Sequence, residues 1–171
     1  MVDVVAEVSP AQADIVHGFV RSELFERTFQ EGMELVEETA AYLDGDGRRD
    51  SKLLSRACAL SYAGESMRLT TRLMQVASWL LVQRAVREGD MDPREACLSR
   101  YRIGAKSVCQ GEAAESLEDL PGGLLSLLDR SERLYERVLY LDTKMFIDAP
   151  AEEASHPVLS QFERLQAAFG N

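Results

Sequence analysis

The feature that most constrains the fold is an uninterrupted helical pattern over residues 51–88, which ends just before Gly89. No proline interrupts this run, which would make about ten turns of α-helix. A helix of this length draws most of its stability from packing against other elements rather than from propensity. The chain is therefore expected to be all-α, with this segment as the long central helix of a bundle.

Two stripes of large and small residues run along this central segment. The first comprises Leu53, Ala57, Leu60, Gly64, Met67, Thr71, Met74, Ser78 and Leu81. The second comprises Ala63, Ser66, Thr70, Leu73, Ala77 and Leu80. Small residues that recur every seven positions let a neighbouring helix approach closely. Each stripe is therefore predicted to contact one neighbouring helix, with a close contact at Gly64. The face with Val76, Trp79 and Val86 is left for a loop or another chain.

Helical patterns also cover residues 22–43 and 121–146. Ser22 is a suitable N-cap for the first of them. Its inner face is predicted at Ser22, Phe25, Phe29, Gly32, Val36, Thr39 and Leu43, and that of the other at Leu124, Leu128, Leu134, Val138, Leu141 and Met145. With the central helix at 51–88 they predict an antiparallel three-helix bundle within a domain of residues 1–147. Ser9, Pro10 and Gln12 indicate one extra helical turn upstream.

Charged residues are expected to set the register of the first two helices. The outer face of 22–43 carries Glu23, Glu26, Glu31, Glu34, Glu37 and Glu38, and the central helix carries Arg56, Arg68, Arg72 and Arg84 beside its stripes. Antiparallel neighbours would bring the two sets together. Exposed ion pairs contribute only about 0–1 kcal/mol each, so they would select orientation more than add stability.

Composition excludes several classes of function. The net charge is −10 and the pI is about 4.7, which argues against binding to nucleic acid or to anionic membranes. The apolar run at 73–86 is too short and too polar to span a bilayer, so membrane insertion is not expected. Three cysteines without a CxxC pair indicate a reducing, cytoplasmic setting.

The sequence contains no complete catalytic motif, and neither a metal nor a cofactor is expected. Its two histidines, His17 and His156, lie near the ends of the chain. One enzymatic alternative is an all-α magnesium-dependent nucleotide pyrophosphohydrolase, which holds its metal with paired ExxE motifs on facing helices. Glu34 and Glu37 supply one pair, but Glu65 on the central helix is followed three positions later by Arg68. The chain is therefore predicted not to be an enzyme.

Residues 102–119 show little periodicity and are predicted to form a mobile loop before the third helix. Arg102 and Lys106 lie in this loop, and loops on rigid scaffolds often carry recognition. Both residues are therefore candidates for partner binding.

The C-terminal tail, residues 148–171, is predicted to be a flexible segment with a short amphipathic end. Pro150 and Pro157 bracket an acidic stretch that cannot bury enough apolar surface to pack. Beyond it, five apolar residues recur at helical spacing: Val158, Leu159, Phe162, Leu165 and Phe169. Of these, Leu159, Phe162, Leu165 and Phe169 are further candidates for partner binding. Self-association into a homodimer is left open.

Three runs of the sequence resemble the family called regulator of CtrA degradation. They are EGMELVEETAAYLDGDGR at 31–48, SYAGESMRLTTRLMQVASWLLVQRAVREG at 61–89 and SERLYERVLYLDTKMF at 131–146. The similarity covers about residues 19–146, and ESMRLTTRLMQVASWLL is the most specific part of it.

The resemblance implies a small helical-bundle protein of alphaproteobacterial type that acts as an adaptor for the protease ClpXP. Such an adaptor joins a ClpX complex already primed by a response-regulator-like protein. It delivers cell-cycle regulators, CtrA included, directly or through a further adaptor that responds to cyclic di-GMP, and it localises to the cell pole. The family has no catalytic residues to carry over. The alternative is a non-catalytic bundle that sequesters one partner.

Overall fold

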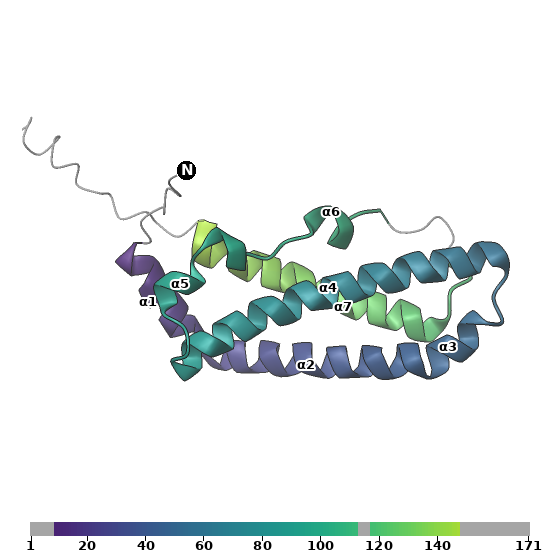
Figure 1. The fold of residues 1–171 in the computed structure, drawn as a ribbon, viewed down its shortest axis with the longest axis horizontal. Helices are drawn as coiled ribbons and strands as arrows, with labels where there is room; N and C mark the ends of the chain where they lie inside the picture. Colours follow the sequence, from purple (N-terminus) through teal and green to yellow (C-terminus); the bar gives the residue numbers. More distant parts are fainter. Residues whose placement is uncertain (1–8, 113–116, 148–171) are drawn as a thin grey trace, which may run out of the picture.

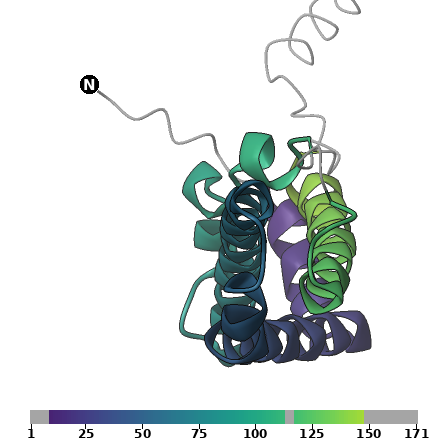
Figure 2. The same cartoon turned by 90° about the vertical axis from the view of Figure 1, so that its right-hand side faces the viewer.

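The computed structural model describes residues 9–112 and 117–147 (Figure 1). Three long helices form the bundle: α2 (Glu23–Asp44), α4 (Arg56–Glu88) and α7 (Gly122–Asp142). Successive long helices run antiparallel, and the end-on view in Figure 2 shows that α4 packs against both others. No strand occurs in the described ranges. The predicted all-α three-helix bundle is confirmed.

Six shorter helical elements complete the described chain. They are α1 (Pro10–Val20), α3 (Asp46–Ser51), α5 (Pro93–Ala96), η1 (Ser99–Tyr101), α6 (Lys106–Cys109) and η2 (Thr143–Ile147). The single turn expected near Ser9 is in fact the full helix α1, which packs against α4 and α5 at one end of the bundle. Ser9 caps it, as its hydroxyl accepts a hydrogen bond from the amide of Ala11 at 3.2 Å.

Local capping signals fix the helix ends. Ser22 accepts from the amide of Phe25 at 3.2 Å, which confirms the predicted start of α2. The central helix starts later than expected, because Ser55 is its N-cap and accepts from Cys58 at 3.3 Å. It ends at Gly89, whose φ of 83° lies in the left-handed region that favours glycine.

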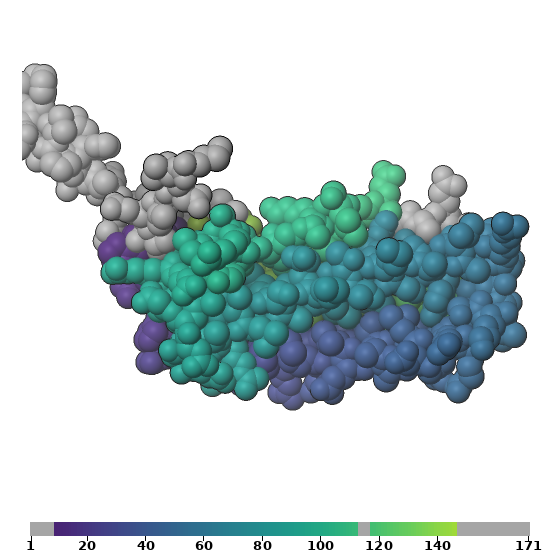
Figure 3. Space-filling view, in the orientation of Figure 1, coloured from purple at the N-terminus to yellow at the C-terminus, as the bar shows by residue number. Residues whose placement is uncertain are grey.

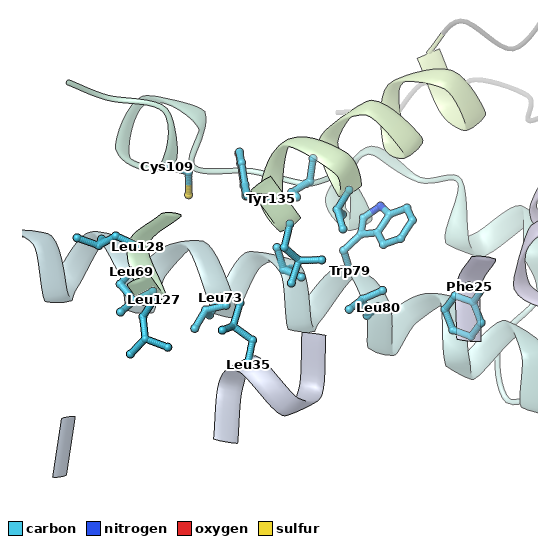
Figure 4. Close-up of a cluster of buried hydrophobic side chains, with 14 of the residues drawn as sticks. Phe25, Leu35, Leu69, Leu73, Trp79, Leu80, Cys109, Leu127, Leu128 and Tyr135 are labelled. Carbon is cyan, nitrogen blue, oxygen red and sulfur yellow. The ribbon is translucent and has the colours of Figure 1, made fainter. Parts of the chain in front are cut away.

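The core lies where α4 faces α7 and α2 (Figure 4). Trp79 is buried, and its indole N–H donates to a carboxylate oxygen of Asp142 on α7 at 2.7 Å. Val76 and Val86 are also buried. The face of the central helix that the sequence left for a loop or another chain is therefore the face that packs against the rest of the molecule.

The first stripe of the central helix points outward, which corrects the prediction that it contacts a neighbouring helix. The exposed fractions are 87% for Leu53, 71% for Leu60, 72% for Met67, 63% for Met74 and 52% for Leu81. A Cβ added at Gly64 would meet no atom within 4 Å, so the close contact predicted there does not exist. The second stripe is confirmed at Leu73 and Leu80, which are buried.

The close approach occurs instead at Gly32 on α2. A Cβ at this position would lie 2.6 Å from Leu80 Cδ1, 3.8 Å from a methyl group of Val76 and 3.9 Å from one of Leu134. Gly32 therefore sits where α2, α4 and α7 meet, and its missing side chain sets the distance between the three helices.

The ion pairs to the acidic face of α2 come mainly from α7 rather than from the central helix. Arg130 pairs with Glu38 at 2.7 Å, and Arg137 pairs with Glu31 at 2.5 Å. From α4, Arg87 pairs with Glu26. The four arginines expected in this role do otherwise: Arg84 pairs with Glu88 on its own helix, Arg68 and Arg72 turn toward α6, and Arg56 is exposed.

Matched substitutions at the two glycines test this packing. We expect Gly32→Leu to lower the free energy of unfolding by about 1–3 kcal/mol, because the new side chain must displace the buried Leu80. Gly64→Leu should leave it unchanged or raise it by up to about 1 kcal/mol, since leucine is the better helix former and the site is open. Urea denaturation of both variants measures the difference, and equal stability of the two would contradict the assigned contacts.

Candidate partner-binding face

A buried arginine ties the segment before α7 to the bundle. Arg72 on α4 is only 3% exposed. Its guanidinium donates twice to the carbonyl of Cys109, at 3.1 and 2.8 Å, and also to the carbonyl of Leu128 at 3.3 Å and the hydroxyl of Ser131 at 3.1 Å. A single side chain thus joins α4, α6 and α7.

Further hydrogen bonds hold the same segment along its length. Arg68 donates to the carbonyl of Gly111 at 2.8 Å and to that of Glu112. Gly104 is held on both sides, because its amide donates to Gln75 at 3.0 Å and its carbonyl accepts from Tyr135 at 2.9 Å. Burial, with Cys109 nearby, raises the pKa of Tyr135 to about 12, so its hydroxyl remains a donor.

The expectation of a mobile loop over 102–119 is therefore corrected for residues 102–112, which form packed structure with α6 at their centre. Residues 113–116 lie outside the described ranges.

The predicted site residues do not come together. Arg102 lies mostly inside the molecule, where it pairs with the buried Asp142 at 3.0 Å and covers the ring of Phe146. Burial lowers the pKa of Arg102 and raises that of Asp142, while their pairing opposes both shifts. Lys106 is exposed on α6. The candidates Leu159, Phe162, Leu165 and Phe169 lie outside the described residues.

The strongest candidate for a binding surface is the outward face of α4, which the sequence prediction had placed inside. We call Leu60, Met67, Met74 and Leu81, with the small residues between them, the α4 face. In the space-filling view, the surface of α4 as a whole runs across the middle of the molecule, between α6 and α2 (Figure 3). Isolated exposed apolar residues are ordinary, but contiguous apolar surface on a helix is typical of interaction sites.

The α4 face carries no charge between Arg56 and Arg84. Only three charged residues occur in that interval: Glu65, Arg68 and Arg72. Glu65 and Arg72 are buried, and Arg68 points to the carbonyls beyond α6. The surface therefore suits an apolar helix and offers no fixed charge to attract a nucleic acid or a small ion.

A groove of about 350 Å³ runs along one edge of the α4 face, between α4 and α2. Its lining is largely apolar and comprises Val36, Thr39, Ala40, Leu43 and Asp44 from α2 with Thr70, Leu73, Met74 and Ala77 from α4. The side chains of Thr70 and Ala77 are small, so they leave space on the α4 side of the groove. Large apolar side chains of a bound helix could occupy that space.

The described residues contain no group of three or more His, Cys, Asp or Glu side chains that could hold a metal ion. Glu34 and Glu37 are exposed on α2, whereas Glu65 is buried beside Arg68 at 3.9 Å. The half motif of the pyrophosphohydrolase alternative therefore gains no second pair from α4. Across the same residues, no helix is long and apolar enough to cross a membrane.

Comparisons with known proteins relate the whole bundle to one family. The family described as "Protein of unknown function (DUF1465)" matches residues 16–169. Among solved structures, RcdA from Caulobacter crescentus CB15 is similar, with 64% sequence identity and a TM-score of 0.64. That match covers 77% of this chain and 98% of the other. A search of curated proteins gave no match.

The buried position of Arg72 and the outward position of the α4 face are the two features that sequence reasoning missed. Both could have been predicted from the side of the central helix on which its polar residues lie. Glu65, Arg72 and Gln83 lie at helical spacing on one side, opposite Met67 and Met74. A buried arginine with distant partners is hard to anticipate, because those partners lie 37 to 59 residues away in sequence.

Replacing Arg72 tests whether it holds α6 in place. We expect Arg72→Met to lower the free energy of unfolding by about 1–3 kcal/mol, since buried carbonyls lose their donors. Trypsin should also cleave after Lys106 faster than in the wild type. Arg84→Met is the matched control, because its exposed ion pair contributes only about 0–1 kcal/mol. Unchanged cleavage after Lys106 in Arg72→Met would show that α6 is held by other contacts.

Proposed function

The chain belongs to the family of RcdA, the regulator of CtrA degradation, and on that premise we propose that it is a non-catalytic adaptor for regulated proteolysis. The observation that carries the proposal is the 64% identity to RcdA over 98% of that chain. In this role the protein joins a ClpXP protease complex that a response-regulator-like factor has primed. It then delivers cell-cycle regulators, CtrA among them, at the cell pole. A further adaptor that responds to cyclic di-GMP extends the set of substrates.

The geometry supports a role that depends on surfaces rather than on chemistry. The bundle is held by a buried core, and residues 102–112 are tied to it by buried hydrogen bonds. A rigid scaffold of this kind can present one surface to a partner without a large ordering cost. The α4 face exposes four large apolar side chains and borders a largely apolar groove, so we assign both to the binding of an apolar helix from a partner protein.

A second candidate is a regulatory bundle that binds one partner and withholds it. The same α4 face would serve, because an apolar helix could be bound without being delivered anywhere. The two roles differ in their effect on a substrate. An adaptor accelerates degradation at low concentration, whereas a sequestering protein only slows it.

A reconstituted degradation assay separates these roles. Purified ClpXP, the priming factor and CtrA are combined with increasing amounts of the full-length protein, and loss of CtrA is followed over time. Acceleration that requires the priming factor supports the adaptor role. Slower loss of CtrA at every concentration supports sequestration. An unchanged rate of loss under all conditions would contradict both roles.

Charge placed on the α4 face should abolish partner binding without unfolding the bundle. We expect Met67→Glu combined with Met74→Glu to slow delivery at least about tenfold, because an unpaired carboxylate would be buried against an apolar partner. Both side chains are exposed, so the melting temperature should hardly change. Leu24→Glu is the control, since Leu24 is an exposed apolar residue of α2 outside the groove. Wild-type delivery by the double variant would place the partner site elsewhere.

A further inference from the structure

The short helix α1 covers the end of the bundle where α4 stops and α5 begins, and it contacts both of them as well as η2 (Figure 1). We propose that α1 is a displaceable helix, and that a partner helix with an amide or hydroxyl side chain takes its place on α4. This second site lies on the side of α4 opposite the α4 face. It goes beyond the proposed function and does not depend on it.

The surface beneath α1 is apolar and buried. The ring of Trp79 on α4 lies 5.9 Å from that of Phe19 on α1, and Val86 is buried on the same side of α4. From α1, Val16 and Val20 are fully buried at a spacing of four. Removal of α1 would therefore expose a surface on α4 that suits one face of an amphipathic helix. We call Trp79, Gln83 and Val86 the α1 site.

A polar group without partners lies in the middle of the α1 site. Gln83 is fully buried, one turn of α4 beyond Trp79. Neither its amide nitrogen nor its amide oxygen has a hydrogen-bond partner among the described residues. A buried amide without hydrogen bonds is destabilising, and the opening of α1 would return it to water. Gln83 therefore favours the loss of α1, or its replacement by a helix that can bond to the amide.

The helix α1 is also weak in itself. It has 11 residues, fewer than an isolated helix needs to be stable in water. Gly18 lowers its helical propensity, and a Cβ there would meet no atom within 4 Å, so packing does not require the glycine. The two ionisable side chains of α1, Asp14 and His17, are exposed. Gln12 adds one hydrogen bond, to the carbonyl of Phe146 on η2 at 3.3 Å.

The connection to α2 allows α1 to leave without unfolding that helix. Arg21 and Ser22 alone separate the two helices. The Ser22 hydroxyl caps α2 by accepting from the amide of Phe25 at 3.2 Å, and this cap does not involve α1. The same hydroxyl donates to the carbonyl of Phe19 at 2.6 Å, which is the contact that opening would break. The helix α1 can therefore move about these two residues while α2 keeps its first turn.

The α1 site defines its partner by chemistry. Residues the size of valine, four positions apart, would repeat the contacts of Val16 and Val20. A serine, threonine, asparagine or glutamine on the same face would bond to the Gln83 amide. Neither valine can do so, and satisfying the amide is worth about 5- to 150-fold in affinity. A helix of this kind therefore binds the α1 site more tightly than α1 does, residue for residue.

Hydrogen–deuterium exchange of the full-length protein tests whether α1 opens on its own. Amides of α1 should exchange faster than those of α4. Gln83→Met should slow α1 exchange about 5- to 150-fold, because methionine keeps the length of glutamine without a buried amide. Thr39→Val is the matched control, since the Thr39 hydroxyl is also buried without a partner but lies on α2. It should stabilise the bundle and leave α1 exchange unchanged.

Two outcomes of this exchange experiment would overturn the proposal. Unchanged or faster α1 exchange in Gln83→Met would show that the amide is already satisfied. Slower α1 exchange in Thr39→Val would show that α1 opens only when the whole bundle unfolds.

A hydroxyl placed on α1 tests whether Gln83 can be satisfied from this side. Threonine has nearly the shape of valine, and burying its hydroxyl without a partner is ordinarily destabilising. Val16→Thr or Val20→Thr should instead slow α1 exchange, because one of the two hydroxyls can bond to the Gln83 amide. In the Gln83→Met background the same threonine should speed exchange. Faster exchange with both threonines in the wild-type background would overturn the predicted partner chemistry.

A peptide added in trans tests the replacement of α1. The probe is a fluorescent peptide of residues 9–21 with the stabilising threonine, and its binding to the full-length protein is followed by anisotropy. Binding should speed exchange of the chain's own α1. Gly18→Ala in the protein should weaken binding about fivefold, since alanine strengthens the tethered helix by that factor. Leu24→Ala on α2 is the control and should change nothing, because Leu24 is exposed. No binding at about 1 mM peptide, or binding that leaves α1 exchange unchanged, would overturn the replacement.

Discussion

The burial of the Arg72 guanidinium is the interaction on which the arrangement of this bundle depends. A charged group removed from water must have hydrogen-bond partners throughout, or its burial is strongly destabilising. Arg72 finds them in the carbonyls of Cys109 and Leu128 and in the hydroxyl of Ser131, with Glu132 4.0 Å away. These partners lie on α6 and α7, so the side of α4 that carries Arg72 can face no other direction.

The outward position of the apolar stripe follows from that constraint. Arg72 and Met74 lie on nearly opposite sides of a helix with 3.6 residues per turn. Trp79 adds to the same constraint, because its indole N–H is satisfied by Asp142 on α7. Turning Met67 and Met74 inward would bring both polar groups into solvent and break the hydrogen bonds that hold α6. The bundle therefore leaves apolar surface exposed because its polar contacts specify the rotation of α4.

This explains which parts of the molecule could be predicted from sequence. The start of α2 and the end of α4 were accessible because they depend on local signals: Ser22 caps α2, and Gly89 ends α4 at positive φ. The start of α4 was placed too early, because its cap is Ser55. The existence of three antiparallel helices was also accessible from the apolar period. That period does not determine which stripe faces inward when two stripes and several polar residues share one helix. The order in residues 102–112 was hidden for a related reason, since it depends on side chains of α4 and α7 that are remote in sequence.

The same division between local and remote contacts bears on how such a protein could recognise others. Residues 102–112, which a lack of periodicity marked as the adaptable element, have their main-chain groups committed to Arg68, Arg72, Gln75 and Tyr135. Their capacity to reshape around a partner is correspondingly small. The α4 face has the opposite character, because its backbone is fixed in a helix while its methionine side chains are unbranched and can adapt to different apolar shapes. Recognition of several partners through one surface is therefore better suited to the rigid helix than to the loop.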